Sequence, residues 1–267
     1  KDEDVADRIG MYVSRLVDDG ATLQVGFGHL PCAILKHLEG KRDLGLHTQV
    51  ITDAFLPLFE NKTITNKRKN FLRGRTVASL CMGTEKLYRY VDGHPGFYFR
   101  ASDFVNDPTV IARNDNLVSI SSALEVDLTG QVCTDSVGYM FYSGIGDQVD
   151  FIRGSAMSKG GFSIVALPST ARGGKISSIV PMVSHVDHSE HSVDVVVTEY
   201  GLVDTRPLAP RQVAEEIIQK CAHPEYRDLL WDYYQRAARE RGGHEPHILR
   251  EAFSFHERFM ETGDMRA

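Results

Sequence analysis

The alternation of short apolar runs with helical stretches over the first two hundred residues most constrains the fold of this chain. Residues 21–25 form an apolar run typical of a buried strand, and Pro31 stands where a proline favours the first turn of a helix. Strands that alternate with helices indicate a parallel sheet covered on its faces. The sequence therefore predicts an α/β fold with an open, mainly parallel sheet flanked by helices.

The expected elements follow from hydrophobic periodicity and from turn residues. We expect strands at 21–25, 44–51, 76–80, 97–99, 162–167 and 193–198, and helices at 2–19, from 31 onward, 54–60, 84–91, 109–113 and 149–159. The runs 117–124 and 131–137 flank the turn 127–130 and predict a hairpin. From residue 210 the chain is expected to be helical, at 211–221, 224–239 and about 246–260. We predict one domain at 1–240, and a helical tail at 241–267 or a linker to a further domain.

Composition excludes some classes of function. The net charge of −6 argues against general nucleic-acid binding, and no apolar run approaches the length of a membrane span. The segment 62–75 is locally basic and is either a solvated loop or a patch for ligand phosphates or for a neighbouring domain. We expect no signal peptide, and four scattered cysteines are typical of a reducing compartment, so we expect a cytoplasmic protein. Because Lys1 is not methionine, we expect the chain to be cut from a longer one.

Three glycine-rich turns, 26–31, 143–148 and 172–174, and the turn at Glu199 follow apolar runs. In open α/β sheets, ligands bind beyond the carboxyl ends of strands, where free backbone N–H groups face an anion or a carbonyl oxygen. A single glycine-rich turn more often only reverses the chain than binds a ligand. The convergence of these four turns at strand ends favours a binding site, for a ligand with phosphates and a long neutral arm.

Other chemistry has weaker support in the sequence. A metal could bind the dense segment that holds His185, Asp187, His188, Glu190 and His191, but a polar turn between two apolar runs explains it better, so we expect no metal. No serine stands in the elbow of a serine hydrolase, and no histidine partner is evident for Cys133. Glu125 and Asp127 could pair as acid and base, although a surface hairpin explains them equally well.

Seven motifs together resemble the class I coenzyme A transferases of the acetyl-CoA hydrolase/transferase group, which include 4-hydroxybutyrate, butyrate and succinate:acetate CoA-transferases. The resemblance covers about residues 5 to 235 and implies the second of two similar α/β domains, the first being absent here. It also implies acyl-CoA and carboxylate substrates, no metal cofactor and a homodimer. The motifs are GxGxxP at 26–31, VNDP at 105–108, LEVDLTGQ at 124–131, SGIGxQVDF at 143–151, LPSTAxGG at 167–174, IVP at 179–181 and VTEYG at 197–201.

The resemblance also implies a set of site residues. Asn106 and Glu199 fall at polar positions near the reacting carbonyl. The backbone of the first glycine turn would line the coenzyme A site and help to form an oxyanion hole. The expected coenzyme A contacts are Gly26, Phe27, Gly28, His29, Leu30, Ser143, Asp147 and Arg172.

The sequence departs from the family pattern at Gln49 and at Asp147. Family members carry glutamate at the position of Gln49, and that carboxylate attacks the thioester to give an anhydride and then a glutamyl-CoA thioester. A primary amide is not a competent nucleophile, because its lone pair is delocalised and it carries no charge. Asp147 stands where the family usually has glycine.

Three hypotheses follow from the departure at Gln49. In the first, the chain is part of a transferase or hydrolase in which Gln49 is an engineered or local change. In the second, it is a non-catalytic domain that binds acyl-CoA as a sensor or regulator. In the third hypothesis, another carboxylate such as Glu125 or Asp53 has replaced position 49 as the nucleophile. This hypothesis is least favoured, because catalytic geometry is exacting.

Overall fold

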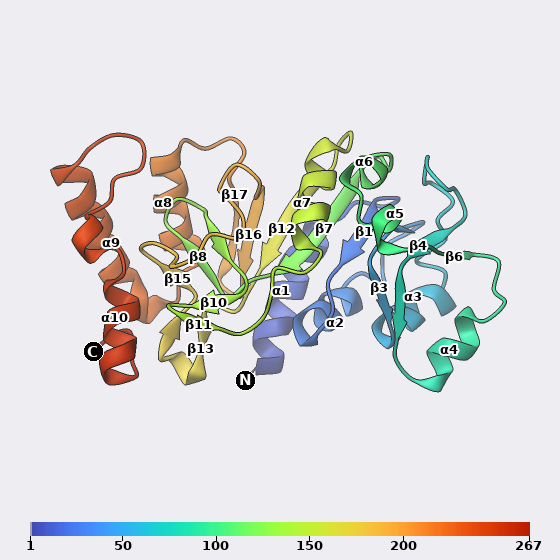
Figure 1. Cartoon of the computed structure of the whole chain (residues 1–267), viewed down its shortest axis with the longest axis horizontal. Coiled ribbons are helices and arrows are strands. Elements are labelled where there is room, and N and C mark those ends of the chain that lie inside the picture. Colours follow the sequence, from blue (N-terminus) through green and yellow to red (C-terminus); the bar gives the residue numbers. More distant parts are fainter. Residues whose placement is uncertain (1) are drawn as a thin grey trace. The chain divides into compact units, whose positions relative to one another are not determined.

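The computed structural model describes residues 2–267 and divides into two compact units (Figure 1). The first unit comprises residues up to 121 together with 146–164, and the second comprises 122–145 and 165–267. One six-stranded sheet has the strand order β17 (Gly201–Asp204), β16 (Val195–Thr198), β12 (Phe162–Ala166), β7 (Leu117–Ser122), β1 (Thr22–Val25) and β2 (Gly45–Leu46). The expected α/β fold with a mainly parallel central sheet flanked by helices is confirmed.

The sheet of the first unit is parallel. β1 (Thr22–Val25) pairs with β2 (Gly45–Leu46) and with β7 (Leu117–Ser122), and Val25 lies opposite Ile120. All four residues of β1 are buried. Strands buried on both faces need helices above and below the sheet. The helices of this unit are α1 (Asp2–Leu16), α2 (His29–Lys36), α3 (Leu56–Glu60), α4 (Glu85–Val91), α5 (Ser102–Val105), α6 (Pro108–Ile111) and α7 (Gln148–Met157).

One expected strand of the first unit is divided in the structure. Residues 44–51 were predicted to be continuous, but β2 ends at Leu46 and β3 (Val50–Thr52) begins after a break. β3 pairs in parallel with β5 (Leu80–Met82), whereas β2 pairs with β1. β4 (Thr76–Ala78) pairs with β6 (Phe97–Phe99). The chain therefore changes sheets across residues 47–49, which places Gln49 in the break.

The second unit is mostly antiparallel. β16 (Val195–Thr198) pairs with β17 (Gly201–Asp204), and β8 (Glu125–Asp127) lies between β9 (Val132–Cys133) and β15 (Ile179–Val180). The predicted hairpin is formed by β8 and β9. The expectation that residues 117–122 belong to this hairpin is wrong. Those residues form β7, which pairs in parallel with β1 and of which the first five residues are buried. The remaining pairs are β10 (Ser136–Val137) with β11 (Met140–Phe141) and β13 (Thr170–Ala171) with β14 (Ile176–Ser177).

The C-terminal helices pack on the second unit. They are α8 (Pro210–Lys220), α9 (Pro224–Glu240) and α10 (Ser254–Thr262), so the last helix begins later than the expected 246. Ile248, Phe255, Phe259 and Met265 share one hydrophobic core with the strands and with α8 and α9. Burying such side chains contributes roughly 1.5–3 kcal/mol each. Residues beyond 240 are therefore integrated into this core, while the boundary expected at 240 stays a prediction.

The basic segment 62–75 is held by main-chain oxygens. Lys69 is 2% exposed, and its Nζ donates to the oxygens of Leu46 and Arg75 at 3.1 and 2.8 Å. Burial lowers the pKa of Lys69 to about 7. Arg68 donates to the oxygen of Asp19. These contacts favour a structural role for the segment.

Within residues 2–267, no helix is long and apolar enough to cross a bilayer.

Candidate functional site

The first glycine turn joins the carboxyl end of β1 to the N-terminus of α2. Gly26 N–H donates to the oxygen of Ile120 at 3.1 Å, which fixes the turn to the end of β7. Gly28 is the N-cap of α2 with φ of 119° and ψ of −175°, a conformation accessible essentially only to glycine. No side chain caps this helix, so its first N–H groups are free for a ligand. Phe27, Gly28 and His29 are exposed and Leu30 is partly buried.

Gln49 is held by its main chain and not by its side chain. Its carbonyl oxygen accepts hydrogen bonds from the N–H groups of Ser79 and Leu80 at 3.0 and 2.9 Å. Its side-chain amide is partly buried and has no hydrogen-bond partner among residues 2–267. A fixed backbone that presents an unengaged side chain suits a residue that acts on a ligand.

The two residues before Gln49 tie it to other candidate residues of the first unit. Thr48 donates from Oγ1 to the oxygen of Val25, next to the glycine turn, at 3.2 Å. His47 is fully buried, and its Nε2 donates to the oxygen of Val105, next to Asn106, at 2.8 Å. The Nδ1 atom of His47 accepts from the Asn114 amide at 3.3 Å. Burial lowers the pKa of His47 to about 4, so the ring is neutral and this tautomer is retained at neutral pH.

Unpartnered polar atoms accompany this site. Asn106 Oδ1, Ser79 Oγ and Ser121 Oγ are buried without a hydrogen-bond partner among the described residues. Ser79 donates its N–H to Gln49, and Ser121 follows the residue that binds Gly26. An unsatisfied buried polar group costs about 1–3 kcal/mol, so such atoms are rare unless a ligand or water completes them. Three of them beside the expected acyl-CoA residues favour a binding site.

Asp147 lies at the N-cap of α7 in the first unit, and Phe151 on the next turn contacts the His47 ring edge-on, with centroids 6.1 Å apart. Burial raises the pKa of Asp147, and the nearby Asp150 adds to the shift. Contacts of Thr48 with Val25 and of His47 with Val105 and Phe151 therefore bring the neighbourhoods of the glycine turn, Gln49, Asn106 and Asp147 together within the first unit.

Ser143, Arg172 and Glu199 belong to the second unit. Ser143 is exposed, its N–H donates to the oxygen of Asp135 at 3.1 Å and its hydroxyl donates to the oxygen of Thr134 at 3.3 Å. Glu199 is 7% exposed, and both of its oxygens are occupied by Ser169, from the N–H at 2.8 Å and from the hydroxyl at 2.5 Å. Ser169 therefore fixes the orientation of the Glu199 carboxylate.

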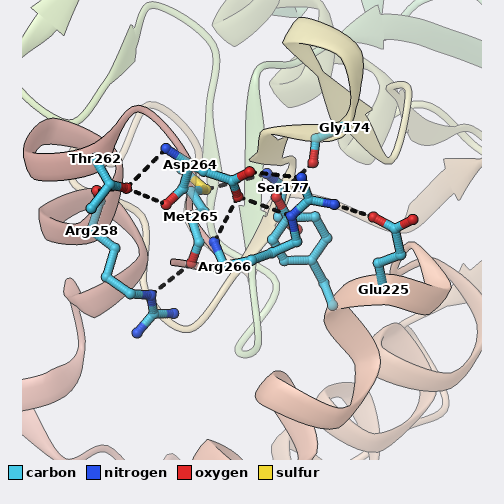
Figure 2. Close-up of polar contacts among 9 residues, drawn as sticks. Gly174, Ser177, Glu225, Arg258, Thr262, Asp264, Met265 and Arg266 are labelled. Atoms are coloured by element: carbon cyan, nitrogen blue, oxygen red, sulfur yellow. Dashed lines mark hydrogen bonds and ion pairs between the residues drawn. The ribbon is translucent and has the colours of Figure 1, made fainter.

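Arg172 lies in a strained loop that the C-terminus supports. Arg172, Gly173 and Gly174 all have positive φ, and the exposed guanidinium of Arg172 donates to the Tyr142 hydroxyl at 3.2 Å. The Tyr226 hydroxyl donates to the oxygen of Gly174 at 2.7 Å. Figure 2 shows Met265 reaching Ser177, just after this loop, while Arg266 binds Asp264 and Glu225. The last residues of the chain thus brace the loop that carries Arg172.

The alternative nucleophiles are engaged in structural contacts. Glu125 is fully buried, and both of its oxygens bind Nε2 of His256 at 3.0 and 2.9 Å. Asp53 accepts from the N–H and the hydroxyl of Thr84, each at 2.9 Å. Burial raises the pKa of the Cys133 thiol, which disfavours the reactive thiolate. None of the three presents a free nucleophile.

Sequence reasoning missed His47, Ser169 and His256, which act on the candidate residues through hydrogen bonds. Ser169 lies within the motif at 167–174 and His47 lies two residues before Gln49, but no local signal marks a buried histidine as a donor to a main-chain oxygen 58 positions away. Only the fold reveals such contacts.

A parallel α/β sheet with an uncapped glycine turn at a strand end, and polar residues gathered beside it, is typical of α/β proteins that bind a ligand beyond the carboxyl ends of their strands. The chain belongs to the acetyl-CoA hydrolase/transferase family, because residues 83–234 match the model of the acetyl-CoA hydrolase/transferase C-terminal domain. The resemblance inferred from the motifs is thereby confirmed.

Known proteins agree with this membership. The chain is 44% identical to the 4-hydroxybutyrate coenzyme A transferase of Clostridium kluyveri, over 87% of this chain and 55% of the relative. It is 37% identical to the acetyl-CoA hydrolase of Eremothecium gossypii, over 91% and 47%. The crystal structure of 4-hydroxybutyrate CoA-transferase from Porphyromonas gingivalis matches with a TM-score of 0.79 at 40% identity, over 87% of this chain and 56% of that one. The chain spans about half the length of the curated relatives it matches.

Proposed function

We propose that this chain is the coenzyme A half of an acyl-CoA:carboxylate CoA-transferase or acyl-CoA hydrolase. One arrangement carries the proposal. Thr48 ties the segment of Gln49 to the strand before the uncapped turn at Gly28. His47 ties the same segment to the residue before Asn106, whose side-chain oxygen has no partner among the described residues. Free N–H groups at the turn suit the thioester oxygen as it gains charge. The proposed coenzyme A contacts in the second unit are Ser143 and Arg172, with Glu199 as a polar group.

In the proposed chemistry a carboxylate at position 49 attacks the thioester carbonyl. The C–S bond breaks, giving an acyl-glutamyl anhydride and the coenzyme A thiolate. The thiolate then attacks the glutamyl carbonyl, releases the acyl group as its carboxylate and leaves a glutamyl-CoA thioester. An incoming carboxylate or water resolves this thioester, which separates transferase from hydrolase. With Gln49 the first step has no nucleophile.

The second candidate is a non-catalytic domain that binds acyl-CoA, for instance as a regulator. The observation that favours it is the amide of Gln49 itself, since neither Glu125 nor Asp53 is free to replace the missing carboxylate. Both candidates require an acyl-CoA site at the glycine turn, and they differ in whether a carboxylate at position 49 restores the covalent step.

The site is tested by calorimetry with acetyl-CoA on Gly28→Ala. Gly28 has a φ of 119°, so an alanine strains the backbone there, and because its Cβ would meet no atom within 4 Å it causes no clash in the core. We expect affinity to fall at least about tenfold, because the N–H groups lose their geometry.

Gly93→Ala is the matched control. Gly93 also has positive φ and open space around its Cβ position, but it lies between α4 and β6. Its affinity for acetyl-CoA should be unchanged. Equal affinities of both variants and the unmodified chain would remove the glycine turn from the proposal.

A further inference from the structure

Four metal-ligand side chains meet in the second unit, outside the residues discussed above for acyl-CoA. Cys133, Asp135, His185 and Asp187 each offer one ligand atom, and these atoms all lie within 4.8 Å of one another. We propose that these four residues bind a zinc ion. The sequence pointed only to the segment 185–191, where a polar turn was the favoured explanation.

Pairing between distant segments creates the cluster. Val132 and His188 form an antiparallel bridge, in which the Val132 N–H donates to the His188 oxygen at 2.9 Å. The oxygen of Val132 accepts from the N–H of Asp187 at 3.0 Å. This bridge sets residues 133–135 beside 185–187. His188, Glu190 and His191 do not join the ligand group.

Three of the six distances between the ligand atoms are close to those of a tetrahedral site, and all six lie within 4.8 Å. Two donors at about 2.0–2.3 Å from one zinc ion lie roughly 3.3–3.6 Å apart. His185 Nδ1 is 3.1 Å from Asp135 Oδ1 and 3.6 Å from Asp187 Oδ1. Cys133 Sγ is 3.7 Å from Asp135 Oδ1. One thiolate, one imidazole and two carboxylates form a donor set that zinc accepts.

Charge gives an independent reason for a cation. The side chains of Asp135 and Asp187 are 8% and 4% exposed, and Cys133 is fully buried. His185, which is 51% exposed, contacts both carboxylates. Hydrogen bonds from the N–H and the hydroxyl of Thr134 and from the N–H of Asp135 already satisfy Asp187 Oδ2, but two carboxylates and one imidazole still leave the group with net negative charge. A divalent ion balances that charge.

The outer contacts orient the ligands as known metal sites require. Asp187 Oδ2 accepts from the N–H of Thr134 at 2.6 Å and of Asp135 at 3.2 Å, which leaves Oδ1 directed at His185. When zinc binds, the S–H bond of Cys133 breaks, its proton leaves to solvent and a Zn–S bond forms. Affinity should therefore rise with pH.

The ion would also steady the loop that follows. The oxygen of Asp135 accepts from the N–H groups of Tyr142 and Ser143 at 2.7 and 3.1 Å. A fixed Asp135 therefore fixes Ser143. A role of Ser143 toward coenzyme A rests on the proposed function, whereas zinc binding does not.

The test measures zinc affinity in the absence of acyl-CoA. Tag-free protein is stripped with a chelator and titrated with Zn²⁺ against a chromophoric competitor. We expect one ion per chain. His185→Gln removes a half-exposed ligand that the fold does not need, and it should weaken affinity at least about tenfold. His191→Gln is the matched control, because that exposed histidine of the same segment pairs only with Glu190, and its affinity should be unchanged.

Cobalt(II) identifies the ligands. The cobalt-loaded chain should show thiolate-to-cobalt charge-transfer absorption, which Cys133→Ser should abolish while circular dichroism confirms that the variant is folded. Absence of stoichiometric zinc binding would overturn the proposal. Equal affinity of His185→Gln and the unmodified chain would also overturn it, since the ion would then be adventitious only.

Discussion

His47 donates a hydrogen bond from Nε2 to the main-chain oxygen of Val105 across 2.8 Å, and so joins the segment of Gln49 to that of Asn106. The two candidate residues lie more than fifty positions apart in sequence and on different elements. Their relative position therefore depends on a neutral, buried imidazole. This dependence makes the site sensitive to pH and to substitution at a residue that is not expected to touch the ligand.

Stability should fall in mild acid because of His47. Its pKa is about 4 in the folded chain against about 6.5 when unfolded, so the unfolded state binds the proton first as pH falls. The contribution is complete above pH 6.5 and is lost between pH 6.5 and 4, by about 3 kcal/mol at roughly 1.4 kcal/mol per pKa unit. Urea unfolding across this range measures it.

His47→Gln supplies the comparison, because a glutamine amide can donate to the Val105 oxygen without titrating. Its free energy of unfolding should vary less with pH between 6.5 and 4, whereas exposed His191→Gln should keep the original dependence. A profile of His47→Gln that is parallel to the unmodified chain would show that His47 is not the titrating group.

Ser169→Ala should destabilise the second unit. The hydroxyl of Ser169 is one of two donors to the buried Glu199 carboxylate, and a hydrogen bond to a charged group is worth roughly 1.5–3 kcal/mol. Ser143→Ala removes an exposed hydroxyl that donates to a main-chain oxygen at 3.3 Å and should cost under about 0.5 kcal/mol. Similar losses in the two variants, by denaturant unfolding, would mean that Ser169 does not hold Glu199.

The buried pair of Glu125 and His256 should be strongly coupled. His256→Leu leaves the fully buried Glu125 without its partner, which typically costs about 3–5 kcal/mol. Adding Glu125→Leu should restore part of the loss, because an apolar pair needs no charge compensation. A double variant that is less stable than His256→Leu would contradict a purely structural role for Glu125.

The sequence predicted what local patterns determine. The strand at 22–25, the glycine turn and the helix after it follow from neighbouring residues, and so do α8 and α9. It failed where pairing between distant segments decides. The run 44–51 divides because its two halves pair with different strands, and 117–122 joins the parallel sheet and not the hairpin. The proposed zinc ligands come from two segments about fifty residues apart, which no local signal could associate.

The motif residues behave in the same way. Gly28 was recognisable because its conformation excludes other residues, and Gln49 because it replaces a charged group in a recognised motif. The hydrogen bonds from His47 and Thr48 that position Gln49 are tertiary contacts, which composition and spacing do not encode.

The central claim is that this chain holds an acyl-CoA site whose covalent step is silent only because position 49 is an amide. Intact-protein mass spectrometry after mixing with acetyl-CoA and borohydride tests it, on the chain as it stands and on Gln49→Glu, each supplied with the first domain of a family relative. We predict a coenzyme A adduct, or the reduced residue it leaves, only with Gln49→Glu. An adduct on the unmodified chain would place the nucleophile elsewhere, and no adduct on either would contradict the transferase account and leave acyl-CoA binding alone.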